Sequence, residues 1–157
     1  MLVSVSISAY NEENYLPAIF ESLVHQTYPH KQIEIVLINA MSTDRTRSLM
    51  NEFQEKYQHE FYAIKIFDNP KKTLNTGLNL GFKHSDGDCY LKIDAHSHIP
   101  EDFIEKNVNV IERGERVCGG RRPTIVETDD ELAKTLHIVE ESALGSSIAN
   151  YRKGDES

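Results

Sequence analysis

Apolar residues along the chain follow two periods that alternate with each other. Four runs rich in β-branched and aromatic residues have the length and composition of strands, at 2–8, 33–38, 61–67 and 87–94. The segments between them repeat apolar residues every three or four positions, as amphipathic helices do. The first of these segments carries Leu16, Ile19, Phe20, Leu23 and Val24. This alternation predicts an α/β fold, a Rossmann-like parallel sheet with helices on both faces.

The third helical segment carries both an apolar stripe and two small residues. The stripe consists of Leu74, Leu78 and Phe82. Gly77 and Gly81 lie within the same segment, where the absence of a side chain would let the helix approach the sheet closely.

Local signals predict where several other elements begin. Ser42 or Thr43 is expected to cap the second helix, and Pro100 to open a helix after the fourth strand. A short strand is expected around Val117, and 128–131 form a capping box ahead of a last helix. The chain has 157 residues, the size of one ordinary domain, so we expect 1–157 to form a single domain.

Composition excludes several classes of function. The formal net charge is −8 and the basic residues are scattered, so neither a nucleic acid polymer nor an anionic membrane surface is an expected partner. Cys89 and Cys118 have no metal-type spacing. Because no signal peptide or membrane-spanning run is visible in the sequence, we expect a cytoplasmic location.

Polar residues gather where three of the expected strands end, at 8–14, 39–44 and 94–98. Parallel strands end at one edge of the sheet, where ligands bind in open α/β folds. The glycine-rich fingerprints of dinucleotide-binding and P-loop proteins are absent. A nucleotide site built from side chains and a metal remains open.

In the order and spacing of its motifs, the chain resembles the family-2 glycosyltransferases, which have the GT-A fold and use nucleotide-sugar donors. The motifs are VSVSISAYNEENYL, EIVLINAMSTDRT, NPKKTLNTGLNLGFKHSDGDCYLKIDAH and GGRRP. The resemblance is closest to exopolysaccharide-type members, in which the fourth strand ends in Asp-Ala-His. It implies an inverting, metal-dependent transfer from a nucleotide sugar, expected to be UDP-linked, to a saccharide or lipid-linked acceptor in cell-surface or exopolysaccharide synthesis.

The resemblance assigns a metal and a diphosphate to the end of the fourth strand. Family members carry Asp-x-Asp there, and this chain has Asp94, Ala95 and His96. We therefore expect Asp94 and His96 to bind Mn²⁺ or Mg²⁺, with the imidazole shifting the preference toward the transition metal. The alternative is a polar turn with solvated histidines. His98 is expected to be a loop histidine.

The resemblance also places the uracil and ribose of the donor at the first strand end. The residues concerned are Ala9, Tyr10, Asn11 and Glu12. The alternative role for the polar members of this set is to cap the following helix, and both roles are compatible.

Other donor contacts are implied further along the chain. Where relatives carry a base-contacting aspartate this chain has Ala40, so Asn39 is the candidate to bond the base with its amide. Lys72 and Asn79 match a basic residue and an asparagine that contact the donor in relatives. For Lys72, a solvated surface lysine is the alternative.

No carboxylate in the sequence is identifiable as the base that would deprotonate an acceptor hydroxyl. We therefore expect the chain to be the N-terminal, donor-binding part of a longer glycosyltransferase. A membrane-associated partner at the inner face of the membrane stays open as an expectation for the rest of that protein. Two alternatives stay open. One is a nucleotide-sugar-binding module without catalysis, and the other is a nucleotidyltransferase.

Overall fold

The computed structural model describes residues 1–119 and gives the alternating order that the sequence predicts. The elements are β1 (Val3–Ala9), α1 (Leu16–Val24), the 3₁₀ helix η1 (His30–Gln32), β2 (Ile33–Asn39), α2 (Thr46–Tyr57), β3 (Ala63–Asp68), α3 (Leu74–Lys83), β4 (Cys89–Asp94) and α4 (Phe103–Glu112). The chain divides into two compact units, Met1–Val108 and Asn109–Ser157. All four strands belong to the first unit. No helix within 1–119 is long and apolar enough to cross a membrane.

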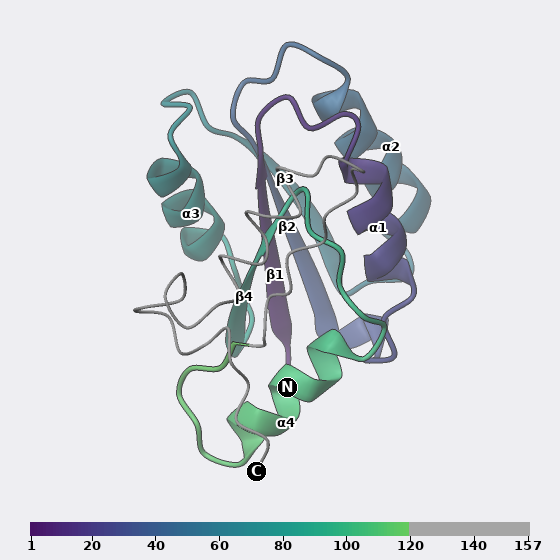
Figure 1. The fold of residues 1–157 in the computed structure, drawn as a ribbon, viewed down its shortest axis with the longest axis vertical. Coiled ribbons are helices and arrows are strands. Elements are labelled where there is room, and N and C mark those ends of the chain that lie inside the picture. Colours follow the sequence, from purple (N-terminus) through teal and green to yellow (C-terminus); the bar gives the residue numbers. More distant parts are fainter. Residues whose placement is uncertain (120–157) are drawn as a thin grey trace, which may run out of the picture. The chain divides into compact units, whose positions relative to one another are not determined.

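The four strands form one parallel sheet in the order β3-β2-β1-β4. β2 lies inside the sheet and is buried along its whole length, as strands covered on both faces are. Because all strands run in the same direction, β1, β2, β3 and β4 end at one edge (Figure 1). This geometry brings the three polar stretches of the sequence to one end of the sheet.

The alternation in β1 separates the two faces of the sheet. Val3, Val5 and Ile7 belong to the apolar core, which also contains residues of α1 and α2. Ser6 and Ser8 lie on the other face, against α3, so α1 and α2 cover one face and α3 the other (Figure 1). A fully buried aliphatic side chain of this kind contributes about 1.5–3 kcal/mol to folding.

The glycines of α3 face the sheet, as their sequence positions predict. A Cβ on Gly77 would lie 2.5 Å from Ser8 Oγ, and one on Gly81 would overlap Ser6 Oγ. The accompanying stripe marks the helix correctly but does not face the sheet, because Leu74 and Phe82 are exposed. The glycine positions take up the closest contact with the sheet, while Leu74 and Phe82 lie on the exposed side of α3.

Two local predictions are wrong. α2 begins at Thr46, and neither Ser42 nor Thr43 caps it; Asp44 Oδ1 instead accepts from Thr46 N at 2.9 Å. Val117 and Cys118 are not part of a strand in the described chain, which ends at residue 119; Val117 is 85% exposed and lies in irregular chain. The capping box at 128–131 and the last helix lie outside the described residues.

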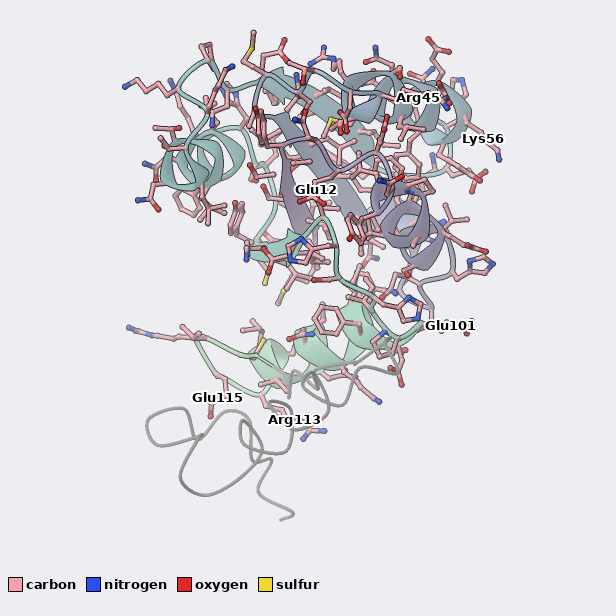
Figure 2. The ribbon with its side chains drawn as sticks, turned by 45° about the horizontal axis from the view of Figure 1, so that its top comes forward. Glu12, Arg45, Lys56, Glu101, Arg113 and Glu115 are labelled. Atoms are coloured by element: carbon pink, nitrogen blue, oxygen red, sulfur yellow. The ribbon has the colours of Figure 1, made fainter. Side chains whose placement is uncertain are left out.

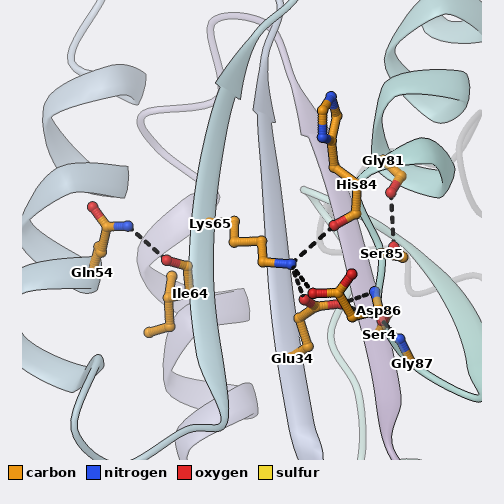
Figure 3. Close-up of polar contacts among 10 residues, drawn as sticks. All are labelled: Ser4, Glu34, Gln54, Ile64, Lys65, Gly81, His84, Ser85, Asp86 and Gly87. Carbon is orange, nitrogen blue, oxygen red and sulfur yellow. Dashed lines mark hydrogen bonds and ion pairs between the residues drawn. The ribbon is translucent and has the colours of Figure 1, made fainter.

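A buried charge cluster joins the strands at the amino end of the sheet (Figure 3). Glu34 of β2 is fully buried, and its carboxylate pairs with Lys65 Nζ of β3 at 2.5 Å. Lys65 also contacts Asp86 Oδ2 at 2.7 Å, and Asp86 N donates to Glu34 Oε2 at 2.8 Å. Ser4 Oγ donates to the same carboxylate oxygen, so the buried charge is both paired and hydrogen-bonded.

The turn that precedes β4 is attached to this same end of the sheet. Gly87 N donates to Ser4 Oγ at 2.9 Å. The backbone N–H of Asp88 donates to Leu2 O at 2.8 Å, while its carboxylate accepts from Leu2 N at 2.9 Å. These bonds fix the position at which β4 starts beside β1.

Candidate functional site

The register of the strands places the ends of β1, β2, β3 and β4 next to one another. Asn39 pairs with Ala9 on one side and with Asp68 on the other. Asp94 pairs with Ser8. The sequence prediction that the polar strand ends meet at one edge is therefore confirmed for the first, second and fourth strands. β3 adds Asp68, which the sequence analysis did not single out.

Hydrogen bonds join the loop after β1 to the loop after β2. Asn11 adopts a left-handed conformation with φ of 54°. Its backbone N–H donates to Ser42 Oγ at 3.1 Å, and its side-chain oxygen accepts from Thr43 N at 2.9 Å. Asparagine tolerates this conformation better than most residues, so Asn11 sets the loop's path and bridges it to its neighbour.

A second set of bonds connects the same loops closer to the helices. Glu13 N donates to Asp44 Oδ2 at 3.1 Å, and Glu12 N donates to Thr46 Oγ1 at 2.8 Å. Desolvation raises the pKa of Asp44, but hydrogen bonds from Thr46 and from the backbone N–H of Glu13 outweigh it, so the pKa lies below its ordinary value. The ionised Asp44 thus holds the two loops together.

Asn39 is buried, and both ends of its amide already have partners in the protein. Its Nδ2 donates to Asp68 Oδ1 at 2.7 Å, and its Oδ1 accepts from Ser42 N at 3.0 Å. Arg47 of α2 donates to the same Asp68 oxygen at 2.7 Å. Asp68 could have been noticed as an acidic residue at the end of a strand. Its link to Asn39 depends on strand pairing, which the sequence does not give.

Asp94 lies at the tip of β4 and is ion-paired with Lys92 through Oδ1. Its side chain is 22% exposed. Ala95, the next residue, is buried. The strand therefore ends with one half-buried carboxylate and then turns, with Ser97 N bonded to Asp94 O at 3.0 Å.

His96 is exposed in this turn and faces the loop after β1. Its Nδ1 lies 3.5 Å from Glu12 Oε1, and its ring contacts that of Tyr15 edge-on at 6.3 Å between centroids. Figure 2 labels Glu12, which lies in that loop beside the end of the sheet. His98, expected to be a loop residue, contacts Ser22 Oγ of α1 at 3.3 Å.

The remaining predicted contacts lie on exposed parts of the surface. Tyr10 is 50% exposed. Lys72 is exposed with φ of 56°, and Asn79 is exposed on α3. Within residues 1–119, neither Lys72 nor Asn79 forms a side-chain hydrogen bond or ion pair with the loops that follow β1, β2 and β4.

The donor groups at the tip fit a divalent cation that arrives with a phosphate ligand. Glu12 and Asp94 offer carboxylates and His96 an imidazole, a mixed set that suits Mn²⁺ as well as Mg²⁺. In the part of the chain that the structure describes, no three such groups are arranged to enclose a metal by themselves. Mg²⁺ is commonly held by one or two carboxylates together with substrate phosphates and water, so a site of this kind does not need three protein groups around the metal.

Solved structures of glycosyltransferases share this fold. Residues 1–349 of Staphylococcus aureus TarS, in complex with UDP-GlcNAc, superpose with a TM-score of 0.62 at 24% identity, covering 72% of this chain and 32% of that one. The mannosyltransferase PcManGT from Pyrobaculum calidifontis, in complex with GDP-Man and Mn²⁺, gives 0.68 at 23% identity, covering 77% and 36%. The predicted GT-A-type α/β fold is confirmed.

Curated relatives are also glycosyltransferases by name. A dolichyl N-acetyl-alpha-D-glucosaminyl phosphate 3-beta-D-2,3-diacetamido-2,3-dideoxy-beta-D-glucuronosyltransferase from Methanococcus voltae is 33% identical over 111 residues, 71% of this chain and 34% of that protein. An uncharacterized glycosyltransferase from Haemophilus influenzae is 30% identical over 156 residues, 98% of this chain and 42% of that protein. The chain spans less than half the length of either relative.

The sequence model of one family matches almost the whole chain. That family is described as glycosyl transferase family 2, and the match covers residues 4–156. The special likeness to exopolysaccharide-type members stays a prediction. This chain belongs to glycosyl transferase family 2.

Proposed function

We propose that residues 1–157 form the donor-binding part of a glycosyltransferase that moves a sugar from a nucleotide sugar to a saccharide or lipid-linked acceptor. The observation that carries this proposal is the approach of His96, just beyond the end of β4, to Glu12 in the loop after β1, at the edge where the parallel strands end. Membership of the family supports it, as does the relative whose name includes a dolichyl phosphate-linked sugar.

Three side chains would hold the divalent cation in this proposal. Asp94 and His96 come from the end of β4, and Glu12 comes from the loop after β1. A bound Mn²⁺ or Mg²⁺ supplies charge that stabilises the diphosphate leaving group. The protein's part is to carry these groups at one edge of the sheet, where His96 already lies beside Glu12. Asn11 and Asp44 contribute indirectly by fixing the loop that carries Glu12.

The nucleoside would lie against the first loop. Tyr10 is exposed there, and Ala9 ends the strand with its carbonyl bonded to Ala40 N at 2.9 Å. Because the amide of Asn39 is already paired with Asp68 and Ser42, we expect Asn39 to shape the base site and to contact the base only if those bonds rearrange. A uridine nucleotide is the proposed donor, with Lys72 and Asn79 at its outer side.

Calorimetric titration of the chain with UDP-GlcNAc, GDP-mannose and dTDP-glucose, each with and without Mn²⁺, tests the proposal. We expect at least one donor to bind, and to bind more tightly with Mn²⁺. Asp94→Asn should weaken the metal-dependent part, whereas Asp102→Asn, a matched change in an exposed ion pair just before α4, should not. Failure of all three donors to bind in the presence of Mn²⁺ would overturn the proposal.

A further inference from the structure

Lys92 and Asp94 share one face of β4. They are two positions apart, and Ile93 between them is buried. Lys92 Nζ contacts Asp94 Oδ1 directly. Of the two side chains, that of Lys92 is the more exposed, at 36% against 22% for Asp94. The ammonium group of Lys92 is therefore already paired with the Asp94 carboxylate that we assign to the metal.

Stability alone is a weak explanation for this pair. Ion pairs between partly exposed side chains contribute about 0–1 kcal/mol because solvent screens them and ordering two side chains costs entropy. The cluster of Glu34 and Lys65 at the other end of the sheet differs, since its carboxylate is fully buried. The position of Lys92 is better explained by the ligands that would bind beside Asp94.

Two ligands would change the charge balance around Lys92. A divalent cation on Asp94 repels the ammonium group and competes with it for the same oxygen. A nucleoside diphosphate brings negative oxygens that a lysine can pair with. Lysine carries a compact charge on a flexible four-carbon stem, so its ammonium group can move from a carboxylate to a nearby phosphate by changing rotamer.

We propose that Lys92 is a donor-binding residue that pairs with Asp94 in the free protein and with the diphosphate when donor and metal are bound. This inference rests on the proposed function. It has a thermodynamic consequence, because Lys92 opposes binding of the metal alone and favours binding of the diphosphate. Metal and nucleotide then bind cooperatively, and the coupling is the same whichever binds first.

Lys92→Met separates the two effects, since methionine keeps much of the length of the side chain and removes its charge. We expect the variant to bind Mn²⁺ alone several-fold more tightly. We expect it to bind UDP and GDP in saturating Mn²⁺ about tenfold more weakly, the loss expected for a charge-assisted hydrogen bond. Lys92→Arg should retain most of the affinity for both nucleotides. Lys83→Met, at an exposed lysine of α3, should match the wild type in both measurements.

Isothermal titration gives the nucleotide affinities, electron paramagnetic resonance of free Mn²⁺ gives the metal affinity, and thermal melting checks that each variant is folded. Opposite shifts of the two affinities in Lys92→Met support the proposal. If the wild type binds nucleotide but Lys92→Met shifts both affinities in the same direction, or leaves both unchanged, the role of Lys92 is overturned and the proposed function is not. A wild type that binds neither UDP nor GDP with Mn²⁺ overturns the proposed function and this inference with it.

Discussion

Thr43 donates its backbone N–H to the side-chain oxygen of Asn11 over 2.9 Å, although 32 positions separate the two residues. The bond has a counterpart in the opposite direction, from Asn11 N to Ser42 Oγ. The loops after β1 and β2 therefore support each other, and Glu12 extends from the first of them toward His96.

Asn11 should be replaceable by glycine at lower cost than by alanine. Asn11→Gly loses the side-chain bond, about 0.5–1.5 kcal/mol, but keeps easy access to the φ of 54°. Asn11→Ala loses the same bond and adds the strain of a left-handed residue, about 1–2 kcal/mol more. Urea unfolding of both variants measures the difference. Equal stabilities would contradict the left-handed assignment.

Asp44 should make the protein more sensitive to acid. Its pKa is lowered in the folded state by the bonds from Thr46 and Glu13, which outweigh desolvation. The stability it contributes is present above the unfolded pKa of about 3.9 and is lost as pH falls through the lower folded value. Unfolding free energy measured between pH 2.5 and 6 should fall less steeply in Asp44→Asn. Parallel curves for variant and wild type would exclude this contribution.

Lys65 should limit stability at alkaline pH. Desolvation lowers its pKa, but hydrogen bonds and charge attraction from Asp86 and Glu34 outweigh this and raise the pKa above its ordinary value. The contribution is complete below the unfolded pKa of about 10.4 and is lost as pH rises through the folded value.

Lys65→Met should destabilise the protein by about 3–5 kcal/mol near neutral pH, because Glu34 stays buried without its cation. Glu34→Gln/Lys65→Met should recover part of that loss. Thermal and urea unfolding of the single and double variants measure both the loss of stability and its recovery. A double variant no more stable than the single one would show that the charge of Glu34 is not the cause.

Gly81→Ala should destabilise the packing of α3 on the sheet. Its Cβ would overlap Ser6 Oγ, and overpacking of this kind costs about 1–3 kcal/mol. Ser6 Oγ is buried and has no hydrogen-bond partner among the described residues, so Ser6→Ala should cost little. Ser6→Ala/Gly81→Ala should recover part of the loss, and Lys83→Ala on the exposed side of α3 serves as the control. Urea unfolding of the four variants gives the coupling between the two sites.

The fold was largely predictable because strand and helix periods are local properties of the chain. β2 was expected at 33–38 and runs over Ile33–Asn39. The stripe of α3 identified the helix but not its buried face, because apolar spacing alone does not give that face. There the two glycines decided the face, and Leu74 and Phe82 remained outside. The start of α2 was missed because Ser42 bonds to another loop, a contact between distant segments.

The candidate site was predictable only as a set of residues at strand ends. Sequence reasoning assigned Asp94 and His96 to the metal and Glu12 to the nucleoside, but the approach of His96 to Glu12 follows from strand order. Lys92 and Asp68 were not singled out, since an ion pair across two positions and a bond between strand tips need the sheet to be known.

The turn at Asp86–Asp88 determines which side chains of β4 lie on each face of the sheet, as far as the tip of the strand. Its bonds to Leu2 and Ser4 fix where β4 starts beside β1. Side chains in a strand alternate between faces, so one residue inserted or deleted in this turn would exchange the faces. Ile93 would then occupy the side that now presents Lys92 and Asp94. In engineering this family member, both the length of that turn and its residues must be kept, because Asp86 pairs with Lys65, Asp88 accepts from Leu2 N, and a side chain at Gly87 would overlap Ser4.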